Sequence, residues 1–558
     1  MKVSDFIASR LVELGIRHVF GVGGANIEDM FAAVQRRRPD IRMVLGKHEH
    51  AAGTAADASA RLTGGLGVVF VTSGGGAMNL LHSVAEARAS AVSMLAVVGE
   101  PPTALQGVGA FQDTSGRGGA IDAAAAFEAV SVWCKRVERV ETVPQLLNEA
   151  LDAARSRQPG PAVLLLAKDF QLAELAITLP PISSVIPAAL PDAIELERAA
   201  ALLRIRPVLV IAGDEVARTG AQQQFAEVVE ALDAQVAVVP EARDAYDNFS
   251  PRFVGVSGAM GSSDVAHALA RAAICLVVGT RLPVLARQGL EDLTTKPLLS
   301  VGRRQPYLVS SRGLHLEGSL PQTLRALAAA LGEAPTAADR ATVPHDLGAS
   351  FEHGALTTQR ALQLIQDALP AECTVLVDAG NTGAAAVHAL RIPRSARWLL
   401  AMGMAGMGYA FGAAVGAAFA TQRRCFVLAG DGAFYMHGLD IHTAVEHRLP
   451  VTYIIFNNRA HGMCLVRERL LLRENAGYNA FRDSHLGEGL RAMFPGLVAC
   501  DCRNTVELAH ALEQAAPQAG PCVISLELEH VEVPPFAAFQ RPSQGLTTVS
   551  RGFPDDEH

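Results

Sequence analysis

Short runs of apolar, often β-branched residues alternate along this chain with longer segments that have the periodicity of a helix. A strand buried on both faces of a parallel sheet is apolar throughout, whereas a strand with one wet face alternates between apolar and polar residues. Alternation of such runs with helical segments is typical of βαβ units. The pattern therefore predicts an α/β fold in which helices cover both faces of parallel sheets.

The pattern falls into three units, in keeping with the three or four domains that about 150 residues per domain would give for 558 residues. Strands of the first unit are expected at 18–20, 43–45, 67–72, 94–98 and 162–166, with helices at 51–62 and 78–87. The second unit is expected to have a helix at 193–203 and strands at 207–211, 235–239 and 274–278. Strands of the third unit are expected at 374–377, 425–428, 451–456 and 522–526.

Two segments interrupt this pattern and predict domain boundaries. A Pro-rich stretch covers 179–187, and a polar stretch begins at Gly332. We expect a first domain at 1–178, a central domain at 188–335, a third domain at 352–540 and a C-terminal tail at 541–558.

Composition and charge exclude several classes of protein. Hydrophobic residues make up 50% of the chain and charged residues 19%, as in globular proteins and unlike disordered ones. The net charge of −8 and the lack of long basic runs argue against nucleic acid as a partner. Charges among the first residues leave no apolar core for a secretory signal, so we expect a cytoplasmic protein. The eight scattered cysteines indicate reduced thiols, and we interpret Cys500 and Cys502 as structural.

One uncharged stretch, 398–420, is long enough to cross a bilayer, and it contains the helix-packing pattern Gly412-x-x-x-Gly416. Glycines interrupt its first half, where Gly403-Met-Ala-Gly-Met-Gly408 is expected to form a loop. Only 409–420 remains as a helix, which we expect to be buried in the protein. We therefore expect no membrane as a partner.

The motif with the clearest chemical meaning is Gly430-Asp431-Gly432, which follows an expected strand, while the next expected strand ends in Asn457-Asn458. Both turns would lie at the carboxyl edge of a parallel sheet, where such sheets bind ligands. Carboxylate and amide oxygens suit Mg²⁺ that also binds phosphate. The glycines would let a diphosphate approach the backbone, and a helix opening near Phe434 would point its N-terminus at that charge.

These two motifs resemble the signature of thiamine-diphosphate-dependent enzymes, and other segments are similar to acetolactate-synthase-type members of that family. The similar segments are 18–26, 47–52, 60–64, 71–79, 99–101, 111–113, 159–161, 278–281, 403–408 and 532–536. The resemblance implies three Rossmann-like parallel-sheet domains: one that binds the cofactor's pyrimidine, a central one, and one that binds its diphosphate.

The resemblance also assigns roles to individual residues. Glu49 would hydrogen-bond the pyrimidine N1′ and so help the cofactor's own amino group to remove the C2 proton. Met407 would force the cofactor to bend. Asp431, Asn458 and the backbone carbonyl of Ala460 would hold Mg²⁺. Phe111 and Gln112 would join Glu49 beside the reacting centre. Further cofactor contacts would come from Gly23, Ser73, Asn79, Gly380, Asn381, Thr382, Gly430, Gly432, Ala433, His461, Gly462 and Met463.

Several of these residues have simpler interpretations when they are taken alone. A glutamate at a helix start is often a solvated charge, and a methionine often fills a gap in a core. Phe111 and Gln112 could belong to a packed loop. The many histidines show no spacing that converges on a metal, and only His461 is expected near the substrate.

The chain also departs from the family pattern. Gly23 and Gly75 stand where relatives commonly have proline, which predicts more mobile loops. Arg467 stands where acetolactate synthases carry a tryptophan, so it could hold an acidic acceptor or simply be an exposed helix arginine. Segment 298–306 lacks the acidic residue that flavin-binding relatives place after the corresponding strand, and we expect FAD to be absent.

The resemblance implies a thiamine-diphosphate-dependent lyase or carboligase, comparable to the acetolactate synthase transferases. The enzyme would decarboxylate a 2-oxo acid donor, with pyruvate expected, and join the resulting enamine to a second carbonyl compound. The alternatives are a flavin-linked 2-oxo acid oxidase and a non-catalytic regulatory relative. Because the family's cofactor lies between the first domain of one subunit and the third of another, a homodimer or homotetramer is expected.

Overall fold

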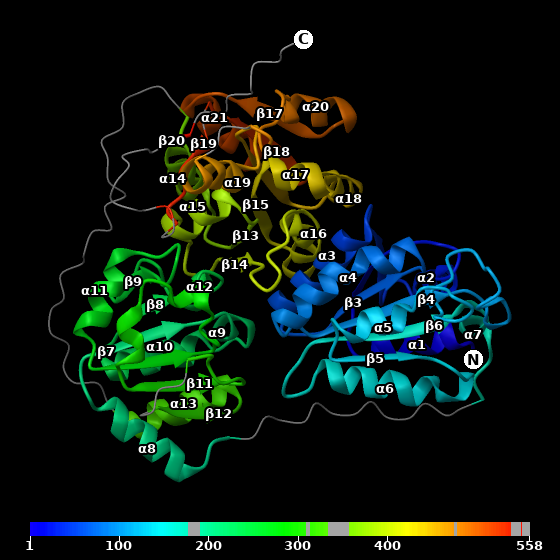
Figure 1. The fold of residues 1–558 in the computed structure, drawn as a ribbon, viewed down its shortest axis with the longest axis horizontal. Helices are drawn as coiled ribbons and strands as arrows, with labels where there is room; N and C mark the ends of the chain where they lie inside the picture. Colours follow the sequence, from blue (N-terminus) through cyan, green and yellow to red (C-terminus); the bar gives the residue numbers. More distant parts are fainter. Residues whose placement is uncertain are drawn as a thin grey trace. The chain divides into compact units, whose positions relative to one another are not determined.

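The computed structural model describes residues 1–176, 190–308, 313–332, 356–473, 477–529, 531–536, 539 and 548–549. Three six-stranded sheets form its framework, the strands within each sheet are parallel, and helices flank each sheet (Figure 1). The predicted α/β fold of three parallel sheets is thereby confirmed. Each predicted domain boundary, the Pro-rich segment 179–187 and most of the tail lie outside the described residues.

The first sheet has the strand order β2-β1-β3-β4-β6-β5. Its strands are β1 (His18–Val22), β2 (Arg42–Leu45), β3 (Gly67–Val71), β4 (Met94–Glu100), β5 (Trp133–Arg136) and β6 (Pro161–Ala167). Its helices are α1 (Val3–Glu13), α2 (Glu28–Arg36), α3 (Glu49–Thr63), α4 (Gly75–Ala89), α5 (Ala123–Glu128), α6 (Val143–Ala154) and α7 (Lys168–Leu172). Strands β3, β4 and β6 are buried at every residue, which explains their continuous apolar sequences.

The central sheet has the order β12-β11-β10-β7-β8-β9, which is that of a dinucleotide-binding Rossmann sheet. Its strands are β7 (Val208–Ala212), β8 (Gln235–Val238), β9 (Phe253–Val256), β10 (Ile274–Val278), β11 (Leu298–Gly302) and β12 (Leu314–Glu317). Its helices are α8 (Ala193–Leu203), α9 (Glu215–Arg218), α10 (Gln222–Leu232), α11 (Ser263–Arg271), α12 (Val284–Arg287) and α13 (Leu320–Leu331).

The third sheet, β14-β13-β15-β16-β18-β17, repeats the order of the first. Its strands are β13 (Cys373–Val377), β14 (Arg397–Leu400), β15 (Arg424–Gly430), β16 (Val451–Asn457), β17 (Val498–Cys502) and β18 (Cys522–Glu527), and β19 (Val531–Glu532) pairs separately with β20 (Thr548–Val549). The helices of this region are α14 (Thr358–Ala368), α15 (Asn381–Ala389), α16 (Tyr409–Thr421), α17 (Asp431–His437), α18 (Ile441–His447), α19 (Gly462–Arg467), α20 (Leu486–Met493) and α21 (Thr505–Ala515). Only the central sheet therefore has the strict Rossmann order.

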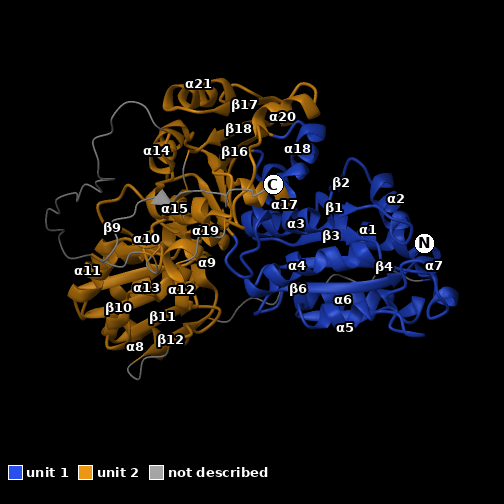
Figure 2. Cartoon of the chain, turned by 45° about the horizontal axis from the view of Figure 1, so that its top comes forward, with its two compact units in different colours: residues 1–186, 401–422, 437–449 blue, residues 187–400, 423–436, 450–558 orange. Residues whose placement is uncertain are grey.

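The chain divides into two compact units (Figure 2). The first consists of residues 1–186, 401–422 and 437–449, and the second of 187–400, 423–436 and 450–558. Helices α16 and α18 therefore belong to the unit of the first sheet, although they come from the third region of the sequence.

The uncharged stretch 398–420 begins within β14 and continues as the predicted loop and the predicted helix, α16. Gly412 and Gly416 lie against α3 so closely that a Cβ atom would come within 2.5 Å of the Ala51 carbonyl oxygen and 1.9 Å of the Ala55 carbonyl oxygen. The Gly-x-x-x-Gly pattern therefore packs two helices of one compact unit together. Among the described residues, no helix has both the length and the apolar character needed to cross a membrane.

Contacts within the second unit join the central sheet to the third one. The buried Arg243 guanidinium donates to the carbonyl oxygens of Val387 and His388 at the last turn of α15. The neighbouring Asp244 carboxylate accepts from Arg397 Nε at 2.8 Å and from the Trp398 N–H at 3.2 Å. A charged pair from the central domain thus holds α15 and β14 in place.

Candidate functional site

The predicted site residues divide into two groups, one in each compact unit. The first unit contains Gly23, Glu49, Ser73, Asn79, Phe111, Gln112 and Met407. The second contains Gly380, Asn381, Thr382, Gly430, Asp431, Gly432, Ala433, Asn458, Ala460, His461, Gly462 and Met463.

Glu49 is the first residue of α3 and its side chain is buried. His48 caps this helix by accepting the His50 N–H on Nδ1 at 3.1 Å. The Glu49 Oε2 atom accepts from Asn79 Nδ2 of α4 at 3.0 Å, and a Cβ atom on Gly76 would lie 3.0 Å from Oε1. The carboxylate is therefore held between two helix starts, and a side chain at position 76 would crowd it.

The loops that follow β1 and β3 meet at the carboxyl edge of the first sheet. Gly23 is exposed, while Ser73 is fully buried and its Oγ accepts from Asn26 Nδ2 at 2.7 Å. A Cβ atom on Gly24 would lie 2.6 Å from the Thr72 side chain, so this side chain lies directly against the backbone of the other loop. The strand order reverses between these two strands, and ligands of α/β sheets bind at such points.

Phe111 and Gln112 lie on a loop that contacts the turn before α4. Gln112 has a positive φ of 58°, and a Cβ atom on Gly74 would come within 2.8 Å of its side chain. The Phe111 ring is 80% exposed. Gln112 is therefore close to the turn that carries Ser73, whereas Phe111 packs against little in this chain.

Met407 is half-buried in the loop 403–408, which contains no helix or strand, as predicted. A Cβ atom on Gly406 would overlap the His82 ring, and one on Gly408 would come within 2.6 Å of the His437 ring. The glycines on both sides of Met407 thus allow the loop to lie directly on two imidazoles.

Four histidine rings contact one another in the first unit, and those of His50 and His82 are stacked. The ring centroid of His50 lies 4.6 Å from that of His82 and 4.3 Å from that of His437. The ring centroids of His48 and His437 are 5.1 Å apart. Burial, together with the neighbouring imidazoles, lowers the pKa of His50 to about 2, so this ring is neutral. These four rings do not form a metal cluster; among the described residues only His485, Glu488 and Asp501 bring three ligand atoms within 4.8 Å of one another.

In the second unit, Asp431 begins α17 directly after β15 and is 1% exposed. Its Oδ1 accepts from the Gly432 N–H at 3.0 Å and its Oδ2 from the Ala460 N–H at 3.1 Å. No cationic side chain of the described residues pairs with it, and burial raises its pKa to about 7 in spite of these backbone donors. This is the electrostatic environment in which a bound cation would stabilise a carboxylate.

Three amide oxygens with no hydrogen-bond partner among the described residues belong to residues at the same edge of the third sheet as Asp431. They are the buried Oδ1 atoms of Asn381, Asn457 and Asn458. Asn457 and Asn458 end the strand next to β15, where Gly430 is in register with Phe456. A Cβ atom on Gly462 would lie 2.9 Å from Asn458 Nδ2 and 3.0 Å from Asn381 Nδ2. This donor set, a carboxylate with unpartnered amide oxygens, fits the oxygen ligands that Mg²⁺ prefers.

The start of α15 lies beside this turn. Gly380 adopts φ 100° ahead of the helix, and a Cβ atom on Gly430 would lie 3.7 Å from Thr382 Oγ1. Strands β13 and β15 flank the point where the strand order of the third sheet reverses. The positive end of α15 is thus available to an anion at that edge.

The remaining predicted residues of this group lie on α17 and around the start of α19. Gly432 and Ala433 are buried in α17, whereas Gly462 and Met463 are half-buried in the first turn of α19. His461 precedes α19, its N–H donates to the Asn479 carbonyl at 2.9 Å, and its ring contacts Phe481. Arg467 is the last residue of α19 and is exposed.

The central sheet has no acidic residue directly after β11, as the sequence indicated. Arg303 and Arg304 follow Gly302 there, and the Arg303 N–H donates to Glu215 Oε2 of α9 at 3.3 Å. The carboxylate at this edge therefore comes from the first strand-to-helix turn of the domain and is engaged with Arg303.

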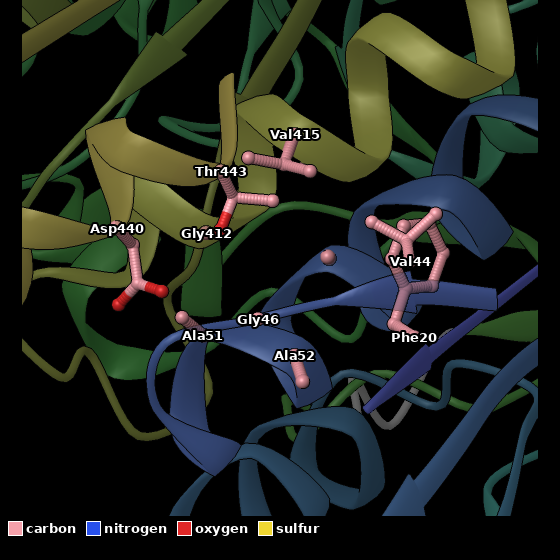
Figure 3. A pocket seen from close by; sticks show the side chains of 10 residues that line it. Phe20, Val44, Gly46, Ala51, Ala52, Gly412, Val415, Asp440 and Thr443 are labelled. Atoms are coloured by element: carbon pink, nitrogen blue, oxygen red, sulfur yellow. The ribbon is translucent and has the colours of Figure 1, made fainter. Parts of the chain in front are cut away.

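A small pocket in the first unit contains none of the predicted site residues (Figure 3). Phe20, Val44, Val415 and small residues of α3 and α16 line it, and Asp440 contributes its one carboxylate. Asp440 already accepts the Lys47 N–H at 3.1 Å. The pocket is mostly a gap between apolar side chains.

Two buried carboxylates that order the loops around these residues were not predicted from the sequence. Glu86 on α4 contacts the loop of Met407, and Glu527 accepts from Asn457 Nδ2 at 3.0 Å and from Arg459 Nη2 at 3.1 Å. Glu86 lies between two alanines of α4, and Glu527 is the last residue of β18, two residues before Glu529. Neither position carries a local motif that would distinguish it from an ordinary surface acid.

The sequence matches three family profiles, one over each sheet. They describe thiamine pyrophosphate enzymes: the N-terminal TPP binding domain at residues 1–118, the central domain at 196–327 and the C-terminal TPP binding domain at 378–526.

Known proteins match along nearly the whole chain. The acetolactate synthase isozyme 1 large subunit of Escherichia coli K12 is 26% identical, and the match covers 96% of each chain. The isozyme 2 large subunit of the same organism is 24% identical over 96% of this chain and 98% of that protein. An X-ray structure of a "putative thiamin diphosphate-dependent enzyme" from Mycobacterium smegmatis superposes with a TM-score of 0.80 at 21% identity, covering 95% of this chain and 99% of that one.

Proposed function

Because this chain belongs to the family of thiamine pyrophosphate enzymes, we propose that it is an acetolactate-synthase-like carboligase. It would bind thiamine diphosphate with Mg²⁺, decarboxylate a 2-oxo acid, with pyruvate as the proposed donor, and join the remaining fragment to a second carbonyl compound. When bound, thiamine diphosphate supplies a nucleophilic carbon and a positive ring that accepts the electrons released by decarboxylation.

The observation that carries this proposal is the buried turn of Asp431 and Asn458. Among the described residues, a carboxylate without a cationic partner and an unpartnered amide oxygen lie on neighbouring strand ends. Asp431, Asn458 and the Ala460 carbonyl would hold Mg²⁺, and the start of α15 would receive the diphosphate. His461, Gly462 and Met463 would border the same ligand.

In the first unit, Glu49 would act on the pyrimidine ring. Its carboxylate is fixed by Asn79, which orients one oxygen and leaves the other beside Gly76. Glu49 would hold a proton at N1′, Met407 would support the bent cofactor from below, and Gln112 would contact the substrate. Orientation of this kind removes much of the entropic cost of reaction.

Product analysis tests the proposed function. Purified protein with thiamine diphosphate, Mg²⁺ and pyruvate should release CO₂ and form a 2-hydroxy ketone or a 2-aceto-2-hydroxy acid when it is offered aldehydes, ketones and 2-oxo acids in turn. Mass spectrometry with ¹³C-labelled pyruvate identifies the fragment that is transferred. CO₂ release without a new carbon–carbon bond for any acceptor would contradict carboligation.

We also propose that the central domain holds no FAD, because Arg303 and Arg304 follow β11 where the acidic residue would be expected. An absorbance scan of freshly purified protein should show no flavin bands between about 350 and 500 nm. Flavin in a one-to-one ratio with protein, together with a requirement for an electron acceptor, would instead favour an oxidase. Light scattering of the same sample tests the proposed homodimer or homotetramer.

A further inference from the structure

The loop that carries Met407 begins on the carboxylate of Glu86. Oε1 of this side chain accepts the Gly403 N–H at 3.2 Å, and Oε2 accepts the N–H groups of Met404 at 2.5 Å and Ala405 at 3.4 Å. Successive backbone N–H groups form a concave site that favours an anion. Glu86 is 2% exposed, so its charge is concentrated on this part of the loop.

A buried network keeps that carboxylate in place. Arg61 of α3 donates to Glu86 Oε1 at 2.9 Å and to Asp57 Oδ2 at 2.6 Å, and the Tyr409 hydroxyl donates to Asp57. Burial opposes ionisation of Glu86, but Arg61 and the loop N–H groups outweigh it, and the pKa of Glu86 lies below its ordinary value. Burial raises the pKa of Asp57 instead. The surroundings of Glu86, namely Arg61 and the loop N–H groups, thus favour its charged form.

The far end of the loop has little room to adjust. Ala405 has a positive φ of 53°, a conformation that costs energy for a residue with a Cβ atom. Gly406 and Gly408 lie against the rings of His82 and His437. Residues 403–405, which precede this part of the loop, thus bind the Glu86 carboxylate. The two glycines that flank Met407 contact imidazole rings.

We propose that Glu86 is a positioning residue that sets the height of Met407 beneath the cofactor by holding the backbone N–H groups of residues 403–405. This inference rests on the proposed function, in which Met407 supports thiamine diphosphate. A carboxylate offers acceptor atoms to all three N–H groups, whereas an amide of the same shape presents an NH₂ group to one side and repels the donors there. Glu86 therefore acts through the loop without touching the ligand.

Hydrogen–deuterium exchange of the backbone tests the anchor directly in the ligand-free protein. Peptides covering 403–405 should be protected in the wild type and should exchange at least about tenfold faster in Glu86→Gln. Asp57→Asn is the matched control, because it removes the other carboxylate of Arg61 and leaves Glu86 on the loop. Asp57→Asn should lower thermal stability while 403–405 stay protected. Unprotected 403–405 amides in the wild type, or equal exposure in both variants, would overturn the proposal, and the wild-type result decides even if a variant does not fold.

Ligand-binding measurements distinguish a positioning role of Glu86 from a general loss of structure. Calorimetry at fixed Mg²⁺ should show thiamine diphosphate binding weakened about 10–100-fold in Glu86→Gln, as expected for lost hydrogen bonds to a charged group, with inorganic pyrophosphate binding unchanged within about twofold. Equal weakening of both ligands would indicate a purely structural role, and unchanged thiamine diphosphate binding would contradict the inference. If the wild type itself fails to bind thiamine diphosphate, the proposed function is wrong while the exchange result still stands.

Discussion

Asp431→Ala is expected to abolish the Mg²⁺-dependent binding of thiamine diphosphate. The substitution removes the one charged ligand proposed for the ion, and the remaining amide and carbonyl oxygens cannot balance a divalent charge. Loss of a partner from a buried charge pair costs about 3–5 kcal/mol, which corresponds to a reduction in affinity of more than about 100-fold. Isothermal titration calorimetry with and without Mg²⁺ measures this difference.

The chain offers a matched control for this substitution. Asp501 also accepts N–H groups at a helix start, from Gly487 at 2.6 Å and Glu488 at 3.3 Å, but at α20. Asp501→Ala should therefore cost stability without changing cofactor affinity. Wild-type affinity of Asp431→Ala in the presence of Mg²⁺ would show that the Gly-Asp-Gly turn has another purpose.

Glu49→Gln is expected to slow the exchange of the C2 proton of bound thiamine diphosphate by about 10²–10⁴-fold, the usual contribution of a positioned acid or base. Glutamine keeps the shape of the side chain but cannot give a proton to the ring nitrogen or take it back. Binding of the cofactor should change little, because the proposed metal and diphosphate contacts involve other residues. Quench-flow exchange followed by proton NMR reports the C2 step itself.

Glu28→Gln makes the same change at the first residue of α2, where the side chain pairs with Lys168 at the surface. This control should exchange C2 at the wild-type rate. An unchanged rate in Glu49→Gln at saturating cofactor would remove Glu49 from the mechanism, whereas loss of binding in that variant would assign it to ligand affinity.

The sequence predicted the interior of the sheets better than their edges. Six strands of the three large sheets have no expected counterpart: β5, β9, β12, β14 and β17 lie at the edge of a sheet, and β11 lies inside the central one. An edge strand is wet on one side and has mixed composition, as in the Trp-Cys-Lys-Arg sequence of β5. Strands such as β10 are buried at every residue and are therefore apolar throughout, which makes them visible to a hydrophobic pattern.

The candidate site also contains features that the sequence could predict and features that it could not. Gly430-Asp431-Gly432 and Asn457-Asn458 are short motifs at strand ends, and their adjacency follows from parallel pairing of β15 and β16. The contact of Glu86 with residues 403–405 spans more than 300 residues and depends on how α16 packs against α3. No local pattern predicts such a contact, because Glu86 alone resembles an ordinary helix charge and residues 403–405 alone resemble an ordinary loop.

The distribution of the first unit along the sequence also has a consequence for synthesis on the ribosome. Asp57 and its partner Tyr409 are 352 residues apart. At about 5–20 residues per second, the ribosome needs about 20–70 s to make the helix that covers α3 after α3 itself has emerged. During that interval the small-residue face of α3, including Ala51 and Ala55, has no native partner within its own chain. The nascent protein therefore exposes this face of α3 to chaperones, and to mispairing with neighbouring nascent chains, until residue 409 has left the ribosome.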